Sequence, residues 1–167
     1  MIDEIANELE SLPNKKAAIK FSERFAKTQR QLIEFLFATL EECSSEAQET
    51  GFFIALVAWT YYSRTKKLRS VTEKSIMQKF ELATDEMQSY EEGDESALTR
   101  LLPDDIQDDE VLTFVTMEIE AARQDNEITA DEAGTLFVTL KVVVDCLAES
   151  VENPKLTGKD KWHQEHK

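Results

Sequence analysis

Apolar residues recur every three or four positions along most of the chain, which is the spacing of amphipathic helices. The first segment shows this clearly, with Ile2, Ile5 and Leu9 on one face and Pro13 at its end. No segment alternates convincingly between apolar and polar residues as a half-buried strand would. The pattern predicts six or seven helices, with a short helical turn at 97–102 and longer helices over residues 2–12, 15–42, 51–67, 71–90, about 104–124 and 130–152.

Two of these segments are apolar on nearly every side. Residues 51–62 read GFFIALVAWTYY, without a single charge, and the last predicted helix contains the run LFVTLKVVVDCL. A helix of 12 residues reaches only about 18 Å, whereas the core of a bilayer is about 30 Å thick. We therefore expect an all-α fold, a single antiparallel helical bundle over residues 1–152, with the helices 51–67 and 130–152 at its centre. The polar residues 153–167 are expected to form a flexible tail.

Short motifs predict where some of these helices begin. Ser70 and Glu73 have the spacing of a capping box, in which the two side chains satisfy exposed backbone N–H groups at a helix start. Thr129 and Glu132 have the same spacing ahead of the last helix. Asn126 precedes that box and is expected to adopt a left-handed turn between the last two helices.

The net charge of −15 is distributed unevenly along the chain. Residues 1–79 contain 12 Lys/Arg and 11 Asp/Glu, whereas residues 80–152 contain 3 and 21. Such a field repels nucleic acid and anionic membranes and attracts basic proteins or cations. Two other interpretations stay open. The acids could serve only to keep the surface solvated, or they could pair with the basic half of the chain, within one molecule or across a homodimer.

The densest acidic cluster precedes the helix that ends near residue 124. Its members are Asp104, Asp105, Asp108, Asp109 and Glu110. We expect this cluster to bind a basic protein partner, as in an inhibitor, an immunity protein, an adaptor or a chaperone without enzymatic activity. Direct contact with nucleic acid or a membrane is not expected. A homodimer with the two apolar helices at its seam is a further expectation, compatible with this function.

Residue types that most catalytic sites require are missing from the predicted helices. The two histidines, His163 and His166, lie in the tail, which excludes a Ser-His-Asp triad and most zinc sites from the bundle. There is no glycine-rich phosphate loop. Cys43 and Cys146 stand alone in apolar surroundings, which indicates buried thiols in a reducing compartment. With an acidic N-terminal segment unlike a signal peptide, we expect a cytoplasmic protein that needs no cofactor.

The alternative function is divalent-cation binding in the turn DNEITADE, with Asp125, Glu127, Asp131 and Glu132 as candidate ligands for Ca²⁺ or Mg²⁺. The turn resembles the second half of an EF-hand loop, in which Glu132 would be the bidentate ligand. The first half differs, because Ala121 and Arg123 stand where acids are expected. The stretch is also similar to the helix–turn–helix element of TerB-like domains, which are helical, acidic and in part metal-binding.

A second form of this alternative is a Mg²⁺-dependent phosphohydrolase. Carboxylates spaced three or four residues apart on facing helices can share one Mg²⁺ ion. Such pairs are formed by Glu42, Glu46 and Glu49, and by Asp105 and Asp108. This pattern resembles the MazG-like nucleotide pyrophosphohydrolases. The second motif of that family has no counterpart with the right spacing, because Glu81 and Asp85 are four residues apart rather than three.

Overall fold

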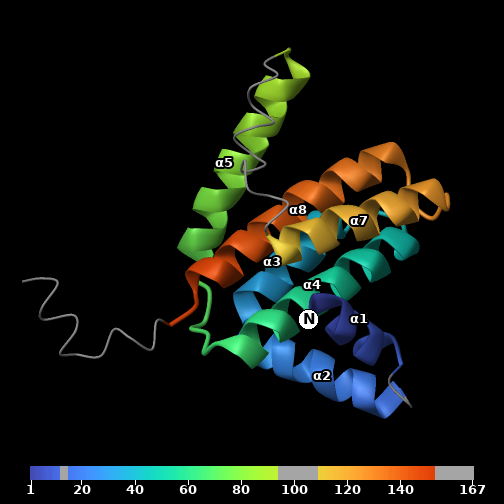
Figure 1. The fold of residues 1–167 in the computed structure, drawn as a ribbon. Coiled ribbons are helices and arrows are strands. Elements are labelled where there is room, and N and C mark those ends of the chain that lie inside the picture. Colours follow the sequence, from blue (N-terminus) through green and yellow to red (C-terminus); the bar gives the residue numbers. More distant parts are fainter. Residues whose placement is uncertain (12–14, 94–108, 153–167) are drawn as a thin grey trace, which may run out of the picture.

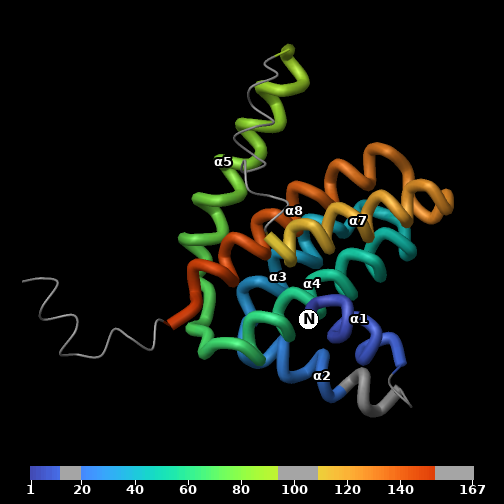
Figure 2. Tube along the Cα trace, in the orientation of Figure 1, coloured from blue at the N-terminus to red at the C-terminus, as the bar shows by residue number. Residues whose placement is uncertain are grey.

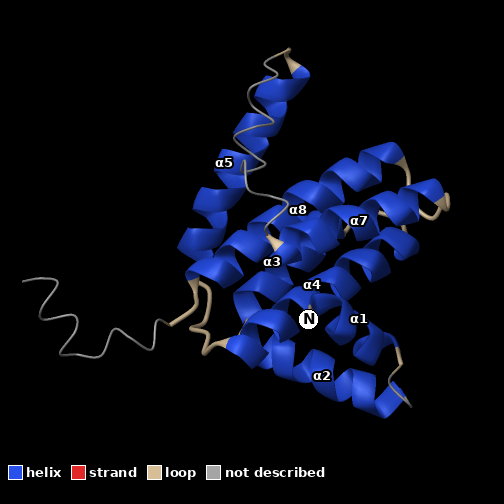
Figure 3. Cartoon of the chain, viewed as in Figure 1, coloured by secondary structure: helices blue, strands red, loops and turns tan. Residues whose placement is uncertain are grey.

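A computed structural model describes residues 1–11, 15–93 and 109–152 of the chain (Figure 1). Within these ranges the chain forms packed α-helices and no strand, which confirms the all-α prediction (Figure 3). The predicted turn at 97–102 and the tail 153–167 lie outside the described residues. The helices are α1 (Ile2–Glu10), α2 (Lys15–Thr28), α3 (Arg30–Leu40), α4 (Ser45–Thr65), α5 (Glu73–Glu91), α7 (Glu110–Gln124) and α8 (Ala130–Glu149).

Helices α4 and α8 form the centre of the bundle, as predicted. Helix α8 packs against α3, α4, α5 and α7, and α4 also packs against α1, α2, α3 and α7. Ile54 and Val57 of α4 and Leu136 and Leu140 of α8 are completely buried. Neighbours on most sides explain why these two segments are apolar almost all round. No helix in the described part of the chain combines the length and apolar character needed to cross a bilayer.

The two central helices run in the same direction. Their N-termini are joined by a hydrogen bond from the Ser44 nitrogen to Glu132 Oε2, at 2.6 Å. Beyond their C-termini, Leu68 and Val151 form an isolated antiparallel bridge. Helices that follow each other closely in the sequence, α3 and α4 or α7 and α8, are antiparallel (Figure 2). The bundle is therefore built from antiparallel hairpins whose central members are parallel.

The predicted helix 15–42 is wrong in one respect, because the chain bends at Gln29 and forms two helices. Gln29 has φ −130° and ψ 52°, and its side chain is 2% exposed. Its Nε2 donates to the Arg69 carbonyl at 3.0 Å, and its Oε1 accepts from the Val71 nitrogen at 2.9 Å. The buried amide thus satisfies the backbone of the connection between α4 and α5, which explains a bend that hydrophobic spacing could not reveal.

The predicted capping box at Ser70 is also wrong. Thr72 is the N-cap of α5, and its hydroxyl accepts from the Ser75 nitrogen at 3.2 Å. The Ser70 hydroxyl instead donates to the carbonyl of Thr28 at the end of α2. The helix begins two residues later than predicted because the preceding residues pair with α2 and α8. Arg69, for example, donates its backbone N–H to the Ser150 carbonyl at 2.9 Å.

Helix α5 lies against the bundle with its first half and diverges from α8 toward its C-terminus (Figure 1). Ile76 and Ala83 are its buried residues, and Phe80 meets Phe35 of α3 edge to face at 5.4 Å. Gly93, with φ 105°, follows the end of the helix, close to the predicted end at residue 90. The divergence leaves the inner side of the last turns of α5 facing a groove.

Candidate functional site

The predicted partner-binding cluster has three members outside the described residues, namely Asp104, Asp105 and Asp108. Its fourth member, Asp109, is the N-cap of α7. Asp109 Oδ1 accepts hydrogen bonds from the backbone nitrogens of Val111 at 3.1 Å and Leu112 at 3.0 Å. A carboxylate in this position satisfies orphan N–H groups and interacts favourably with the helix dipole. Asp109 therefore has a structural role as well as a negative charge.

Glu110 caps a different helix from the one in which it lies. Its Oε1 accepts a hydrogen bond from the backbone nitrogen of Ile2, at the start of α1, at 2.7 Å. This N–H group is the main reason why the pKa of Glu110 lies below its ordinary value. The side chain is still 40% exposed. Glu110 consequently remains ionised at neutral pH, and the N-terminal ammonium, 3.0 Å from its Oε1, balances part of its charge.

The turn proposed as a cation site has the predicted backbone geometry. Asn126 has φ 59°, the left-handed conformation expected for it. Asp125 is the C-cap residue of α7, and the side chains of Asp125, Glu127 and Asp131 are exposed. Thr129 and Glu132 form the predicted capping box, with hydrogen bonds of 3.1 and 3.0 Å.

Glu132 also contacts α4, which the sequence did not reveal. Its Oε1 accepts from the Thr129 nitrogen, while its Oε2 accepts from the Ser44 nitrogen at 2.6 Å. The N–H group of Ser44, followed by that of Thr129, lowers the pKa of Glu132 to about 2. Both oxygens of this carboxylate are thus occupied by backbone donors at the starts of two helices.

The candidate cation ligands are not gathered into one site. No group of three or more His, Cys, Asp or Glu side chains that could hold a metal ion occurs among the described residues. Glu132, the intended bidentate ligand, uses its oxygens to bind backbone N–H groups. The Ca²⁺ or Mg²⁺ alternative therefore gains no support from this part of the chain and stays a prediction.

The carboxylates considered for a phosphohydrolase lie in different parts of the chain. Glu42 lies in the connection between α3 and α4, whereas Glu46 and Glu49 are exposed on the first turns of α4. Asp105 and Asp108 fall outside the described residues. No facing helix in the described structure brings further carboxylates to this pair, since no cluster of three is found there.

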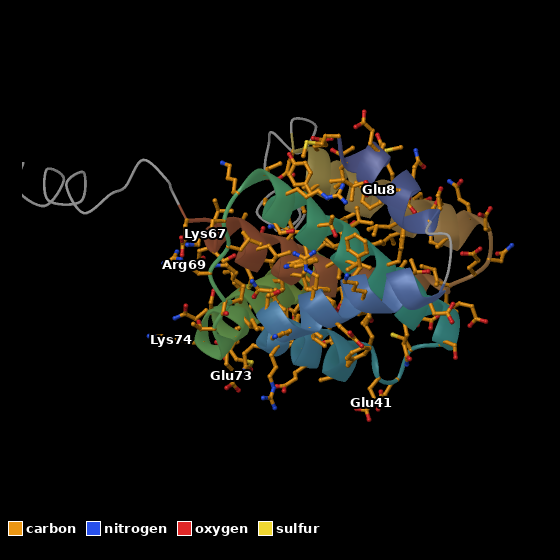
Figure 4. All side chains as sticks on the ribbon, turned by 90° about the horizontal axis from the view of Figure 1, so that it is seen from below. Glu8, Glu41, Lys67, Arg69, Glu73 and Lys74 are labelled. Atoms are coloured by element: carbon orange, nitrogen blue, oxygen red, sulfur yellow. The ribbon has the colours of Figure 1, made fainter. Side chains whose placement is uncertain are left out.

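Ion pairs connect the acids near the end of α8 to a basic end of the molecule. Lys79 pairs with Glu149, and the Lys67 Nζ lies 3.8 Å from Glu152 Oε2. Figure 4 shows Lys67, Arg69 and Lys74 projecting from this end. The sequence suggested that the basic first half of the chain could attract the acidic second half. Glu149 and Glu152 do pair with lysines of the first half in this way. Lys79 lies in the first half of α5, whereas the last turns of α5 extend away from α8 (Figure 1).

The basic cluster that follows Tyr61 and Tyr62 is likewise drawn into the fold. Arg64 makes a bidentate ion pair with Glu8 of α1, with N–O distances of 2.7 and 2.8 Å. Arg69 contributes its backbone and side chain to the contact with the end of α8. A structural role therefore accounts for part of this cluster without a nucleic-acid ligand.

The two cysteines are free thiols. Cys146 is 1% exposed, and burial raises its pKa to about 11. Burial also raises the pKa of the partly exposed Cys43. Both thiols are consequently poor nucleophiles at neutral pH, because the thiolate is the reactive form.

A groove between α5, α8 and the end of α3 was missed by the sequence-based reasoning. It has a volume of about 500 Å³. Phe80 and Met87 of α5 and Val138 of α8 provide its apolar walls, with Glu91 and Asp131 among its polar lining residues. The groove exists because α5 diverges from α8, and a tertiary angle of this kind leaves no signal in a single sequence.

Comparison of the chain with protein-family models, with curated protein sequences and with solved structures finds no match.

Proposed function

We propose that this protein is a non-enzymatic interaction module that presents an acidic surface to a basic partner protein. The observation that carries the proposal is the composition of the second half of α5 and the segment after it. Residues 80–93 contain five acids and no Lys or Arg. Four of these acids, which we call the α5 acids, have exposed side chains: Glu81, Asp85, Glu91 and Glu92.

The region around α7 and the start of α8 extends this acidic surface. Residues 109–135 contain eight acids and one basic residue, Arg123. The Arg123 guanidinium pairs with its neighbour Glu120 on the same helix, at 2.6 Å. The capping carboxylates Glu110 and Glu132 stay charged, because their hydrogen bonds lower their pKa values. The N-terminal ammonium pairs with Glu110, and the surplus of negative charge that remains speeds association with basic proteins and disfavours acidic ones.

The test is a salt titration of a captured partner. The wild-type protein is immobilised at low ionic strength, and a protein that it retains from a lysate of its own host is purified. The dissociation constant is then measured between about 50 and 500 mM NaCl, a range over which the Debye length falls severalfold. We expect a basic partner whose dissociation constant rises steeply with salt.

A matched pair of variants shows which acids are responsible. One variant neutralises the α5 acids with Glu81→Gln, Asp85→Asn, Glu91→Gln and Glu92→Gln, and it should bind at least tenfold more weakly at low salt. The control removes four charges elsewhere, with Glu4→Gln, Glu10→Gln, Glu41→Gln and Glu49→Gln. A partner that binds equally well at 500 mM NaCl, or that distinguishes neither variant from wild type, would contradict the proposal.

A further inference from the structure

The groove between α5 and α8 is open along one side and offers space for an elongated ligand. Its lining extends along α5 from Phe80 to Glu91, which is about three turns of helix. On the other side it follows α8 from Ala130 to Thr139. Two diverging helices with an apolar floor are a common receptor for a third helix, which inserts its apolar face between them.

We propose that this groove binds an amphipathic helix of a basic partner protein, with apolar side chains against Met87 and Val138 and cationic side chains beside Glu91 and Asp131. This inference rests on the proposed function and specifies its site and its ligand. Three independent features of the groove support it: a buried hydroxyl without a partner, a glycine that leaves space, and the sign of the charge along the lining.

The hydroxyl belongs to Thr139, which is completely buried among the lining residues. Its Oγ1 has no hydrogen-bond partner among the described residues. The other threonines of the groove bond to the carbonyl four residues earlier, as helical threonines commonly do: Thr39 to Phe35, Thr84 to Phe80 and Thr135 to Asp131. An unpaired buried hydroxyl costs stability. Because lining side chains cover it, a polar side chain that enters the groove would supply the missing partner only when those side chains move apart.

The glycine is Gly134, on the groove side of α8. A Cβ atom built on it would meet no atom within 4 Å, so packing inside the described fold does not require glycine there. Glycine inside a helix is less stable than alanine. The effect of Gly134 is therefore to keep the groove open at a cost to the helix, which is useful if a ligand approaches α8 closely.

The charge along the groove selects the ligand. The lining includes Glu91 from the last turn of α5 and Asp131 from the first turn of α8, and it includes no Lys or Arg among the described residues. An acidic helix would be repelled by these carboxylates, whereas Lys and Arg side chains at the edges of an apolar face would complement them. The occupant favoured by this arrangement is accordingly basic and amphipathic.

The first experiment uses the full-length protein and a synthetic 18-residue peptide of Leu and Lys, with all Leu on one helical face. The protein is labelled with ¹³C at its methionine methyl groups. Met87 lines the groove, whereas Met117 is 66% exposed on α7 and serves as an internal control. We expect the peptide to shift the Met87 signal and to leave the Met117 signal unchanged. Met87→Leu and Met117→Leu assign the two signals.

Variants then separate groove binding from general attraction to an acidic protein. Gly134→Leu fills the groove with a good helix former and should weaken peptide binding at least tenfold. Glu91→Gln with Asp131→Asn should weaken it roughly tenfold, while Glu4→Gln with Glu10→Gln on α1 makes the same change in net charge and should have little effect. A scrambled Leu/Lys peptide, which cannot form an apolar face, should bind at least tenfold more weakly than the original.

Thr139→Val tests whether the Thr139 hydroxyl contributes to peptide binding. It also provides an independent test of the groove if Gly134→Leu does not fold. The substitution should raise the melting temperature, since it removes an unpaired buried group, and yet weaken peptide binding several-fold. An unchanged affinity of the more stable variant would assign Thr139 a merely structural role and count against the inference.

Other results would overturn the inference in recognisable ways. A peptide could bind in a salt-dependent manner but shift the Met117 signal, or bind the Gly134→Leu variant as tightly as wild type. Either result would refute the groove as the binding site and leave the acidic-surface function intact. Absence of peptide binding at low salt would refute the groove, while the acidic-surface function would still be decided by the salt titration of a protein partner. Binding that appears only when residues 97–102 are replaced by Gly and Ser would show that the chain fills its own groove. A doubled mass in solution that Gly134→Leu abolishes would identify a second copy as the occupant.

Discussion

Glu132 of α8 joins the starts of the two central helices, because its Oε2 lies 2.6 Å from the backbone nitrogen of Ser44, the N-cap residue of α4. The same carboxylate caps α8 itself through the nitrogen of Thr129. One side chain therefore satisfies backbone N–H groups in two helices that are far apart in the sequence, and it does so next to the positive end of both helix dipoles.

Replacing this side chain should lower stability in a pH-dependent manner. The folded pKa of Glu132, about 2, is below its ordinary value of 4.5. The carboxylate therefore contributes stability that is present above about pH 4.5 and is lost as the pH falls toward 2. Glu132→Gln should melt several degrees below wild type at pH 7, and the difference should shrink below pH 4.5. Circular dichroism melts from pH 7 to pH 2 measure this.

The control for Glu132 is Glu127→Gln, which removes a charge from an exposed residue of the same turn. Its melting temperature should stay close to that of wild type at each pH. A constant difference between Glu132→Gln and wild type over the whole range would show that the ionised carboxylate is not the stabilising species.

Replacing Gly51 or Gly134 by alanine should change the free energy of unfolding in opposite directions. At Gly51, a Cβ atom would lie 2.6 Å from Leu40 Cδ1 and 2.8 Å from Leu136 Cδ2, and both leucines are buried. Gly51→Ala should reduce the free energy of unfolding by about 1–2 kcal/mol, because overpacking outweighs the better helix propensity. Gly134→Ala should increase it by about 0.5–1 kcal/mol. Urea denaturation of both variants gives the comparison, and equal signs would contradict it.

Gln29 should be one of the most sensitive polar positions in the core. Gln29→Leu keeps the volume similar but leaves the Arg69 carbonyl and the Val71 N–H without their partner. We expect a loss of about 2–3 kcal/mol of unfolding free energy, together with faster hydrogen exchange at the Val71 amide. Gln78→Leu, on the exposed side of α5, should change stability by less than about 0.5 kcal/mol. Similar losses for both variants would mean that the buried amide has no special role.

The two thiols should react at clearly different rates with a disulfide reagent such as DTNB at pH 8. Cys146 is buried with a pKa of about 11, so its reaction should wait for local unfolding. Cys43 is partly exposed and should react first, although burial raises its pKa as well. Cys43→Ser should remove the faster phase. A fast phase that persists in this variant would place Cys146 in a more accessible position than the structure shows.

Local patterns in the sequence predicted most of the elements of this fold. Three- and four-residue periodicity located the helices, and the absence of charge in residues 51–62 placed α4 at the centre. The box of Thr129 and Glu132 and the turn at Asn126 were also predictable, because each depends on neighbours in the chain.

Most of the features that sequence analysis missed depend on residues far apart in the chain. Glu132 bonds to Ser44 across 88 positions, and the Gln29 amide bonds to Val71 across 42. The bend at Gln29 divides the predicted long helix into two, and the Gln29 side chain makes its contact with Val71 at that bend. The candidate site shows the same limit. Acid counts indicated an acidic surface, yet Asp109 and Glu110 are helix caps, and the groove depends on the angle between α5 and α8.

The parallel arrangement of α4 and α8 has a consequence for how the chain folds. Two parallel neighbours cannot form from a hairpin, so their contact requires closure of the whole loop between Thr65 and Ala130. Such non-local contacts raise the contact order above that of a simple up-and-down bundle and slow the search for the native topology. The hairpins α3–α4 and α7–α8 can form early as local units. Their docking, with Glu132 closing onto Ser44 at one end, is then the step at which the two halves of the protein become one cooperative structure.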